Sequence, residues 1–246
     1  MGGGMNSGTR LVMLAAGQGA RLLPLTTECP KSMQPISGEP LLLRTLRQLR
    51  PLGFGRVIVV VGYKREMVAP AVQSVYPNVE IVNNPDYERD TNIQSTLLGL
   101  DGGEEPSLIF EADVVISDAC RPSIAAVVNG ARSVWFTHGP FRSHQLGGIL
   151  RTDAAGEITD LRYTPRYEDR FKDYKKLLGL LFVGPHEMGV FLTILRAAAT
   201  RTMKQYYMTP WCESLSQLPC RECDLAPAPA ATFNTIEEYR RCRDMF

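Results

Sequence analysis

Residues 11–41 read LVMLAAGQGARLLPLTTECPKSMQPISGEPL, and this stretch decides the architecture of the chain. The apolar run over 11–16 has the length and the bounding signals of a buried strand. It leads into the glycine turn 17–19, where backbone N–H groups can converge on an anion because no bulky side chain intervenes. Arg21 adds a planar guanidinium that suits phosphate oxygens, and Lys31 adds a compact positive charge. The stretch therefore predicts a strand followed by a phosphate-binding loop.

Two commoner phosphate motifs do not describe this loop. The P-loop pattern G-x-x-x-x-G-K-[ST] does not occur in the sequence. The dinucleotide pattern G-x-G-x-x-G begins at Gly17 and Gly19 but has Leu22 in place of its third glycine. Because that glycine lets the helix and the strand pack closely, its absence counts against a Rossmann dinucleotide site.

Strands and helices alternate through the first half of the chain. The β-branched run over 56–61 is typical of a strand buried on both faces. The other elements expected here are strands over 79–82 and 107–111 and helices over 41–49, 65–75 and 92–100. This alternation predicts an α/β fold with a doubly wound, mostly parallel sheet. Ligands of such sheets lie outside the carboxyl ends of the strands, and Gly17, Gly62, Asn83 and Asp113 all follow strands closely.

The second half has a different pattern, with more strands and fewer helices. The expected elements are strands over 132–137, 148–152, 158–162 and 177–183 and helices over 186–199 and 236–242. Thr235 is a plausible N-cap of the last helix, and Glu237 and Glu238 are favourably placed in its first turn. Residues 226–231 read as a connector rich in proline and alanine.

Composition excludes several classes of protein. The 246 residues carry a net charge of +1, with no basic run of the kind that binds nucleic acid. No apolar stretch approaches the roughly 20 residues that span a bilayer. The glycine-rich start lacks the apolar core of a signal peptide, so we expect a cytoplasmic protein with reduced cysteines. Cys220 and Cys223 have the spacing of zinc ligands, but the sequence has no second close pair to complete four ligands. We therefore expect a pair of surface thiols rather than a zinc site.

The longer pattern G-x-G-x-R-x-x-P-x-T-x-x-x-P-K over residues 17–31, followed by Pro35 and Pro40, is far more specific. It resembles the signature of the sugar-phosphate nucleotidylyltransferase superfamily. The resemblance implies a Rossmann-like, GT-A-like nucleotidyltransferase fold: a disordered leader over 1–9, then one domain over 10–246. Its nucleotide-binding half, 10–115, would precede an acceptor-binding half, 116–246, built around an inserted mixed subregion.

Three local strings resemble one branch, the choline-phosphate and aminoalkylphosphonate cytidylyltransferases. They are DTNIQS over 90–95, EAD over 111–113 and the aromatic segment 206–213. Aromatic faces attract ammonium groups. The resemblance implies that the acceptor is bound by Glu111, Tyr207, Trp211 and Glu213. Structural interpretations remain open beside it: Asn92 and Ser95 could cap a helix, and Tyr207 and Trp211 could belong to the core.

The activity implied by this branch joins CTP to a small phosphorylated or phosphonylated acceptor and releases pyrophosphate. Gly17, Gly19 and Arg21 would hold the triphosphate, and Lys31 would draw the acceptor anion towards the α-phosphate. Asp113 would hold Mg²⁺. The full set implied for the nucleotide is Leu14, Ala15, Ala16, Gly17, Gly19, Arg21, Lys31, Gly62, Asn92 and Ser95.

One departure from the branch concerns the second metal ligand. Asn234 occupies the place where the branch supplies a carboxylate, and its amide oxygen can ligate Mg²⁺ only without charge. This departure is the argument for a regulatory module that binds nucleotide without catalysis. A sugar-1-phosphate or molybdenum-cofactor nucleotidylyltransferase, which would share the phosphate-binding loop but bind another acceptor, is the other class that stays open. The natural acceptor and the oligomeric state, a homodimer included, are also left open.

Overall fold

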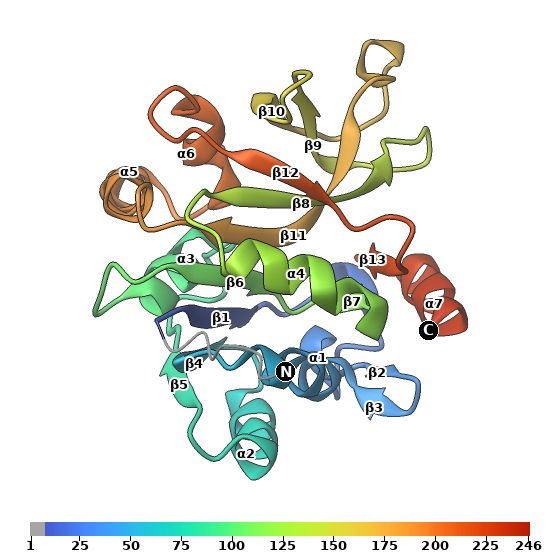
Figure 1. Ribbon diagram of the computed structural model, residues 1–246. Coiled ribbons are helices and arrows are strands. Elements are labelled where there is room, and N and C mark those ends of the chain that lie inside the picture. Colours follow the sequence, from blue (N-terminus) through green and yellow to red (C-terminus); the bar gives the residue numbers. More distant parts are fainter. Residues whose placement is uncertain (1–7) are drawn as a thin grey trace.

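The computed structural model describes residues 8–246, and its centre is a nine-stranded sheet (Figure 1). Four strands form its parallel part in the order β6-β1-β4-β5. They are β1 (Arg10–Ala15), β4 (Arg56–Val61), β5 (Glu80–Asn83) and β6 (Ser107–Glu111). Residues 1–7 of the predicted leader lie outside the described residues. Thr9, which the prediction included in that leader, is buried, and its carbonyl accepts a hydrogen bond from Gly55 N at 3.0 Å.

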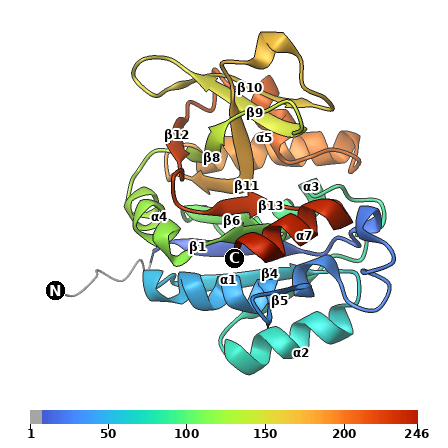
Figure 2. The same cartoon turned by 90° about the vertical axis from the view of Figure 1, so that its right-hand side faces the viewer.

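Helices cover both faces of these parallel strands, as Figure 2 shows. Leu11 and Met13 of β1 belong to one core cluster, and Val12 and Leu14 to the other, because side chains alternate along a strand. The first cluster includes α1 (Leu41–Leu49), α2 (Arg65–Val75) and α4 (Arg121–Val128), and the second α3 (Ile93–Leu100) and α5 (Met188–Arg201). The predicted doubly wound α/β fold is thus confirmed. No helix within residues 8–246 is long and apolar enough to cross a membrane.

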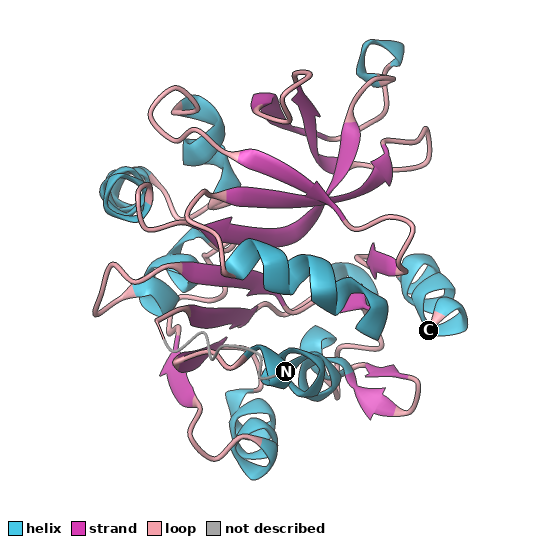
Figure 3. Ribbon diagram, viewed as in Figure 1, coloured by secondary structure: helices cyan, strands magenta, loops and turns pink. Residues whose placement is uncertain are grey.

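The second half of the chain extends the same sheet with mixed strands (Figure 3). β11 (Lys175–Val183) pairs antiparallel with β6 and also with β8 (Val134–Pro140) and β9 (Gly147–Thr152). β10 (Ile158–Thr164) continues from β9, and β12 (Arg221–Asp224) runs parallel to β8. The second half of the chain therefore meets the first half along β6 and β11.

Several elements begin and end where the sequence predicts, and one helix of eight residues and four shorter elements were missed. The helices over 41–49 and 65–75 and the strand over 56–61 match α1, α2 and β4. Missed were α4, α6 (Met208–Glu213), β7 (Val114–Ile116), β12 and β13 (Ala230–Thr232). β13 pairs with β7, so part of the predicted connector is a strand. Strands of three or four residues carry too little alternation to be recognised before their partners are known. The remaining short elements are β2 (Pro35–Ile36), β3 (Glu39–Pro40) and five 3₁₀ turns over 20–22, 31–33, 50–52, 118–120 and 169–171.

The last helix, α7 (Ile236–Met245), closes the fold against the signature stretch. Thr235 is its N-cap, as predicted: its hydroxyl accepts from Glu238 N, and the Glu238 carboxylate accepts from Thr235 N, both at 3.2 Å. The Tyr239 hydroxyl donates to the carbonyl of Pro35 at 2.8 Å. Phe233 packs on Tyr239 with ring centroids 5.2 Å apart. These contacts hold the end of the chain beside residues 31–41.

The predicted surface thiol pair is wrong. Cys220 is 1% exposed and belongs to one core cluster, while Cys223 packs against the other. Pairing of β12 with β8 sends side chains to opposite faces of the sheet, which the cysteine spacing alone does not reveal. Burial raises the pKa of the Cys220 thiol to about 12 and that of Cys223 to about 11. Within residues 8–246 no group of three or more His, Cys, Asp or Glu side chains could hold a metal ion.

Gly99 makes the packing of α3 on the sheet testable. A Cβ at this position would lie 2.3 Å from Val12 Cγ1 of β1 and 3.1 Å from Val60 Cγ2 of β4. We expect Gly99→Ala to lower the free energy of unfolding by about 1 to 3 kcal/mol, because overpacking outweighs the roughly 1 kcal/mol by which helices favour alanine. Urea denaturation measures the change. Gly8→Ala is the control, since no heavy atom lies within 4 Å of its added Cβ. Equal midpoints for the two variants would contradict the close packing.

Candidate active site

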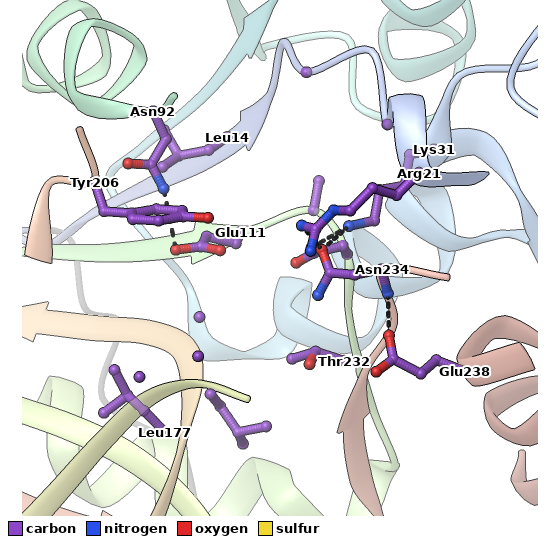
Figure 4. Close-up of a pocket in the computed structure, with 18 of the residues that line it drawn as sticks. Leu14, Arg21, Lys31, Asn92, Glu111, Leu177, Tyr206, Thr232, Asn234 and Glu238 are labelled. Atoms are coloured by element: carbon purple, nitrogen blue, oxygen red, sulfur yellow. Dashed lines mark hydrogen bonds and ion pairs between the residues drawn. The ribbon is translucent and has the colours of Figure 1, made fainter. Parts of the chain in front are cut away.

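A cavity of about 790 Å³ opens at the carboxyl ends of β1 and β6, the place that a doubly wound sheet favours for ligands (Figure 4). Its size lies within the usual range of small-molecule sites. The glycine turn and the ends of the two strands form one side. The opposite walls come from β9, β11, the segment before α6, and α7. Both halves of the chain therefore contribute to a single cavity.

The two glycines of the turn are required for different reasons. Gly19 has a φ of +68°, and a Cβ there would lie 2.9 Å from Lys31 Cβ, so only glycine lets the turn lie against that lysine. A Cβ on Gly17 would have no heavy atom within 4 Å, although this residue lines the cavity. Glycine at position 17 thus leaves room for a ligand, whereas glycine at position 19 makes room for the protein itself.

Positive groups and oxygen ligands meet at one end of the cavity. Lys31 Nζ donates to Asp113 Oδ2 and, at 3.0 Å, to Asn234 Oδ1. Arg21 Nη2 donates to the same amide oxygen at 2.8 Å. Asp113 Oδ1 is buried and has no hydrogen-bond partner within residues 8–246. Figure 4 shows Arg21, Lys31 and Asn234 converging there. This end can hold phosphate groups, and its Asp113 and Asn234 oxygens suit a hard cation.

Asn92 connects the other end of the cavity to the second half of the chain. Its amide nitrogen donates to Glu111 Oε1 at 3.3 Å, and its amide oxygen accepts from Tyr207 N at 2.9 Å. The interpretation of Asn92 as a side-chain cap of α3 is therefore wrong. Asp90 does this instead, because its carboxylate accepts from Gln94 N at 3.0 Å and Ser95 N at 2.8 Å.

Two ionisable groups on the cavity wall have displaced pKa values. Burial raises the pKa of Glu111 to about 7, and the negative charge of Asp113 adds to the rise. Burial also lowers the pKa of Lys176 to about 8, against the stabilising charges of Glu111 and Asp113. Among residues 8–246 the Lys176 ammonium donates only to backbone carbonyls, those of Gly148 at 3.3 Å and Leu177 at 3.0 Å. Glu111 and Lys176 thus lie in one poorly solvated region without a direct ion pair.

The aromatic wall of the cavity differs from the one predicted. Tyr206 and Tyr163 line it, with stacked rings whose centroids are 5.2 Å apart, and Trp135 also contributes. Tyr207 and Trp211 do not line it. They are buried and pack on Trp135 with centroids 5.7 and 5.8 Å away, so they belong to the core, as the structural interpretation allowed.

A family model for the MobA-like NTP transferase domain matches residues 11–176, which include the glycine turn, Lys31, Asp113 and Lys176. The chain belongs to this family. The match covers the parallel part of the sheet and most of the mixed part, and the nucleotidyltransferase resemblance read from residues 17–31 is thereby confirmed.

Two relatives each match 61% of the length of this chain. CMP-5'-(3-aminopropyl)phosphonate synthase of Streptomyces rubellomurinus is 34% identical over 153 residues, which are 24% of that protein. The 2-aminoethylphosphonate cytidylyltransferase of Lancefieldella rimae is 37% identical over 155 residues, 59% of that protein. The matches thus span about a quarter and about three fifths of these relatives.

Solved structures agree on the fold. The CTP:phosphocholine cytidylyltransferase from Streptococcus pneumoniae superimposes with a TM-score of 0.79 at 20% identity, covering 96% of this chain and 98% of that one. A UDP-glucose pyrophosphorylase complexed with UDP-glucose gives 0.78 at 16% identity, covering 96% and 97%. At these identities the likeness establishes the Rossmann-like nucleotidyltransferase architecture.

Most of the site residues predicted from the sequence line the cavity. Those that line it are Leu14, Ala15, Ala16, Gly17, Gly19, Arg21, Lys31, Asn92, Ser95, Glu111, Asp113 and Asn234. Gly62 lines a neighbouring hollow, which shares Tyr87 with the cavity. Glu213 lies on the surface, 3.7 Å from Arg201, and like Tyr207 and Trp211 it does not line the cavity.

The sequence missed several cavity residues whose signals were ambiguous. Lys176 is one of them, whereas its neighbour Lys175 reaches outward, to Glu222 at 2.9 Å and Asp224 at 3.3 Å. Had the strand been extended to residue 175, its alternation would have separated the two lysines. Arg241 and Tyr163 also line the cavity, and no local pattern distinguishes them from ordinary surface residues.

The lowered pKa of Lys176 predicts a dependence of stability on pH. Its ordinary pKa is 10.5 and its folded value about 8, so between these pH values the folded protein binds fewer protons here than the unfolded chain. Stability from this group therefore rises as pH rises from about 8 to 10.5. We expect the unfolding free energy of the native protein, minus that of Lys176→Met, to increase over this window and to stay flat just below it. Urea titrations at pH 7.5, 8.5, 9.5 and 10.5 measure it, and a constant difference would contradict the assignment.

Proposed function

We propose that this protein is a cytidylyltransferase that joins CTP to a small acceptor bearing a phosphonate or phosphate and an amine. One observation carries the proposal: a single cavity has a cationic end and an end with a carboxylate and two stacked tyrosines. Arg21 and Lys31 lie at the first, and Glu111 and Tyr206 at the second (Figure 4). Such a pairing fits an acceptor that carries a negative and a positive group on a short backbone.

The relatives support the nature of both substrates. By their names, two act in cytidylyl transfer to aminoalkylphosphonates, and the chain is 34% and 37% identical to them. The class of acceptor is taken from those names. The cavity is compatible with an amine because the carboxylate of Glu111 faces the same space as Tyr206.

The nucleotide would lie along the carboxyl end of β1. The backbone N–H groups of the glycine turn and the Arg21 guanidinium would hold the triphosphate. Ser32 lines the cavity, and its buried hydroxyl has no partner within residues 8–246, so it can donate to a phosphate oxygen. The base would lie against residues 14–16, Asn92 and Ser95, where backbone groups and the Asn92 amide can distinguish cytosine from other bases.

Transfer requires no covalent intermediate with the protein. An oxygen of the acceptor's phosphonate bonds to the α-phosphorus, and the bond from that phosphorus to pyrophosphate breaks on the opposite side. Lys31 would lie between the two anions and reduce their repulsion as they approach. Its contribution is alignment and charge neutralisation.

The residues present fit a magnesium ion. Asp113 offers one carboxylate with an unpartnered oxygen, and Asn234 offers an amide oxygen, a set that Mg²⁺ completes with water and phosphate oxygens. The ion, held by these two residues, would supply Lewis-acid polarisation of the phosphate oxygens.

A sugar 1-phosphate is the second candidate acceptor. The UTP–glucose-1-phosphate uridylyltransferase of Haloferax volcanii is 44% identical to this chain, but only over 70 residues, 28% of the chain. His144 and Gln145 line the cavity and could bind hydroxyl groups. The carboxylate and the tyrosine pair at the second end favour an amine instead.

Pyrophosphate release decides among these functions. We expect release with CTP, Mg²⁺ and 2-aminoethylphosphonate or choline phosphate to exceed release with glucose 1-phosphate, and CTP to exceed UTP, dTTP, GTP and ATP. Removal of divalent ions by EDTA should abolish the reaction. No release with any acceptor, combined with tight CTP binding, would instead identify a regulatory module.

Lys31 gives a sharper test of the mechanism. Lys31→Ala should lower kcat at least about 100-fold, as the loss of one electrostatic contact to the transition state commonly does. Lys204→Ala is the control, because Lys204 is exposed and does not line the cavity. Steady-state kinetics with both substrates saturating measures the ratio, and a loss below tenfold would contradict the role of Lys31 between the anions.

A further inference from the structure

The ammonium group of Lys31 lies where a metal ion would bind. It donates to Asp113 Oδ2 and to Asn234 Oδ1, the residues that fit Mg²⁺. We propose that Lys31 acts as an internal cation in the ligand-free protein, that it competes with the divalent ion for these oxygens, and that the nucleotide phosphates draw it away. The proposal rests on the proposed function for the identity of the nucleotide, but the competition itself depends only on Lys31, Asp113 and Asn234.

The geometry leaves little room for both cations at once. The side chains of Lys31 and Asp113 are 14% and 18% exposed, so solvent screens their surroundings poorly. Asp113 supplies one negative charge, Asn234 supplies none, and Lys31 already balances the pair. A divalent ion arriving at Asp113 would therefore meet a positive charge within hydrogen-bonding distance of its own ligand. Like charges so placed repel strongly in a partly buried site.

The metal-binding oxygens can stay in place while the lysine leaves. Glu238 accepts a hydrogen bond from Asn234 N at 2.6 Å, so the backbone that carries this amide is held without Lys31. Lys31, in contrast, reaches Asp113 through a flexible four-carbon stem, and it lies on the same side of the cavity as the glycine turn. A triphosphate bound at that turn presents several negative charges to the ammonium, against the single charge of Asp113.

Coupling between metal and nucleotide follows from this arrangement. A metal ion alone binds only molecules whose Lys31–Asp113 pair is open, so its apparent affinity is reduced by the fraction of open molecules. Nucleotide increases that fraction and therefore strengthens metal binding, and the metal strengthens nucleotide binding by the same factor. The protein then takes up its ion together with the substrate that needs it.

The first experiment measures Mn²⁺ binding without nucleotide. Electron paramagnetic resonance titration of free Mn²⁺ gives the dissociation constant of the native protein and of Lys31→Met, which keeps the length of the side chain without its charge. We expect the variant to bind Mn²⁺ at least about tenfold more tightly, because the competing charge is gone. Arg241→Met is the matched control. It removes a positive charge from the same cavity wall, but Arg241 pairs with Glu237 and should change the constant by less than about twofold.

A variant that loses its competing cation yet binds Mn²⁺ no more tightly than the native protein would overturn the proposal. The same holds if neither protein takes up Mn²⁺, or if Arg241→Met tightens binding as much as Lys31→Met. Circular dichroism checks that each variant is folded.

The second experiment needs no variant. Mass spectrometry of the native protein after brief acylation compares the labelling rate of Lys31 with and without saturating Mn²⁺, with Lys172 and Lys204, both exposed, as internal references. We expect Mn²⁺ alone to raise labelling of Lys31 several-fold and to leave the references unchanged. Unchanged labelling of Lys31 at Mn²⁺ concentrations that bind the protein would overturn the competition.

Failure of this proposal can be told apart from failure of the proposed function. If the native protein releases pyrophosphate but Lys31→Met does not change the Mn²⁺ affinity, the proposed function holds and the competition between Lys31 and the metal does not. A protein that shows tighter Mn²⁺ binding in the variant but neither binds CTP nor releases pyrophosphate has the competition and a different function.

Discussion

Three segments that are far apart in the chain meet at the ammonium group of Lys31. The glycine turn packs against the lysine stem, Asp113 follows β6, and Asn234 precedes α7. The ammonium binds the last two and offsets the charge of Asp113, so that Arg21 leaves this end of the cavity positive. Without it, Asp113 would be a partly buried carboxylate with no positive partner, which is costly in a protein interior. The shape of this end therefore depends on a single positive charge.

The C-terminal helix α7 is held at this end of the cavity by contacts of its own. The carboxylate of Glu238 serves α7 as half of a capping box and holds the backbone of Asn234 at 2.6 Å. Tyr239 and Phe233 fasten the helix to the stretch around Pro35. A local device for starting a helix thus also fixes an amide oxygen that faces Arg21 and Lys31. Asn234 and α7 therefore line the same cavity as the glycine turn.

The second end of the cavity arises because β11 pairs antiparallel with β6. That pairing places Gly179 against Glu111, so close that a Cβ on the glycine would lie 2.7 Å from the Glu111 side chain. The other end of β11 pairs with β9 and places Lys176 in the cavity wall. Both groups lose solvent, which raises the pKa of the acid to about 7 and lowers that of the amine to about 8. The protonation states of Glu111 and Lys176 can therefore change when a charged ligand binds.

The sequence alone was enough to determine the glycine turn, Arg21, Lys31 and the parallel strands, because a loop motif and continuous apolar runs are local patterns. The resemblance of residues 111–113 to one branch singled out Asp113, and the departure from that branch at residue 234 singled out Asn234; both line the cavity. Tertiary structure decided which member of each neighbouring pair faces the cavity: Tyr206 and not Tyr207, Lys176 and not Lys175. It decided, too, that Asn92 binds Glu111 while Asp90 caps α3. The physical reason is that the direction of a side chain depends on pairing between β6, β11 and β8, whose partners are separated by tens of residues, and no local spacing encodes that register.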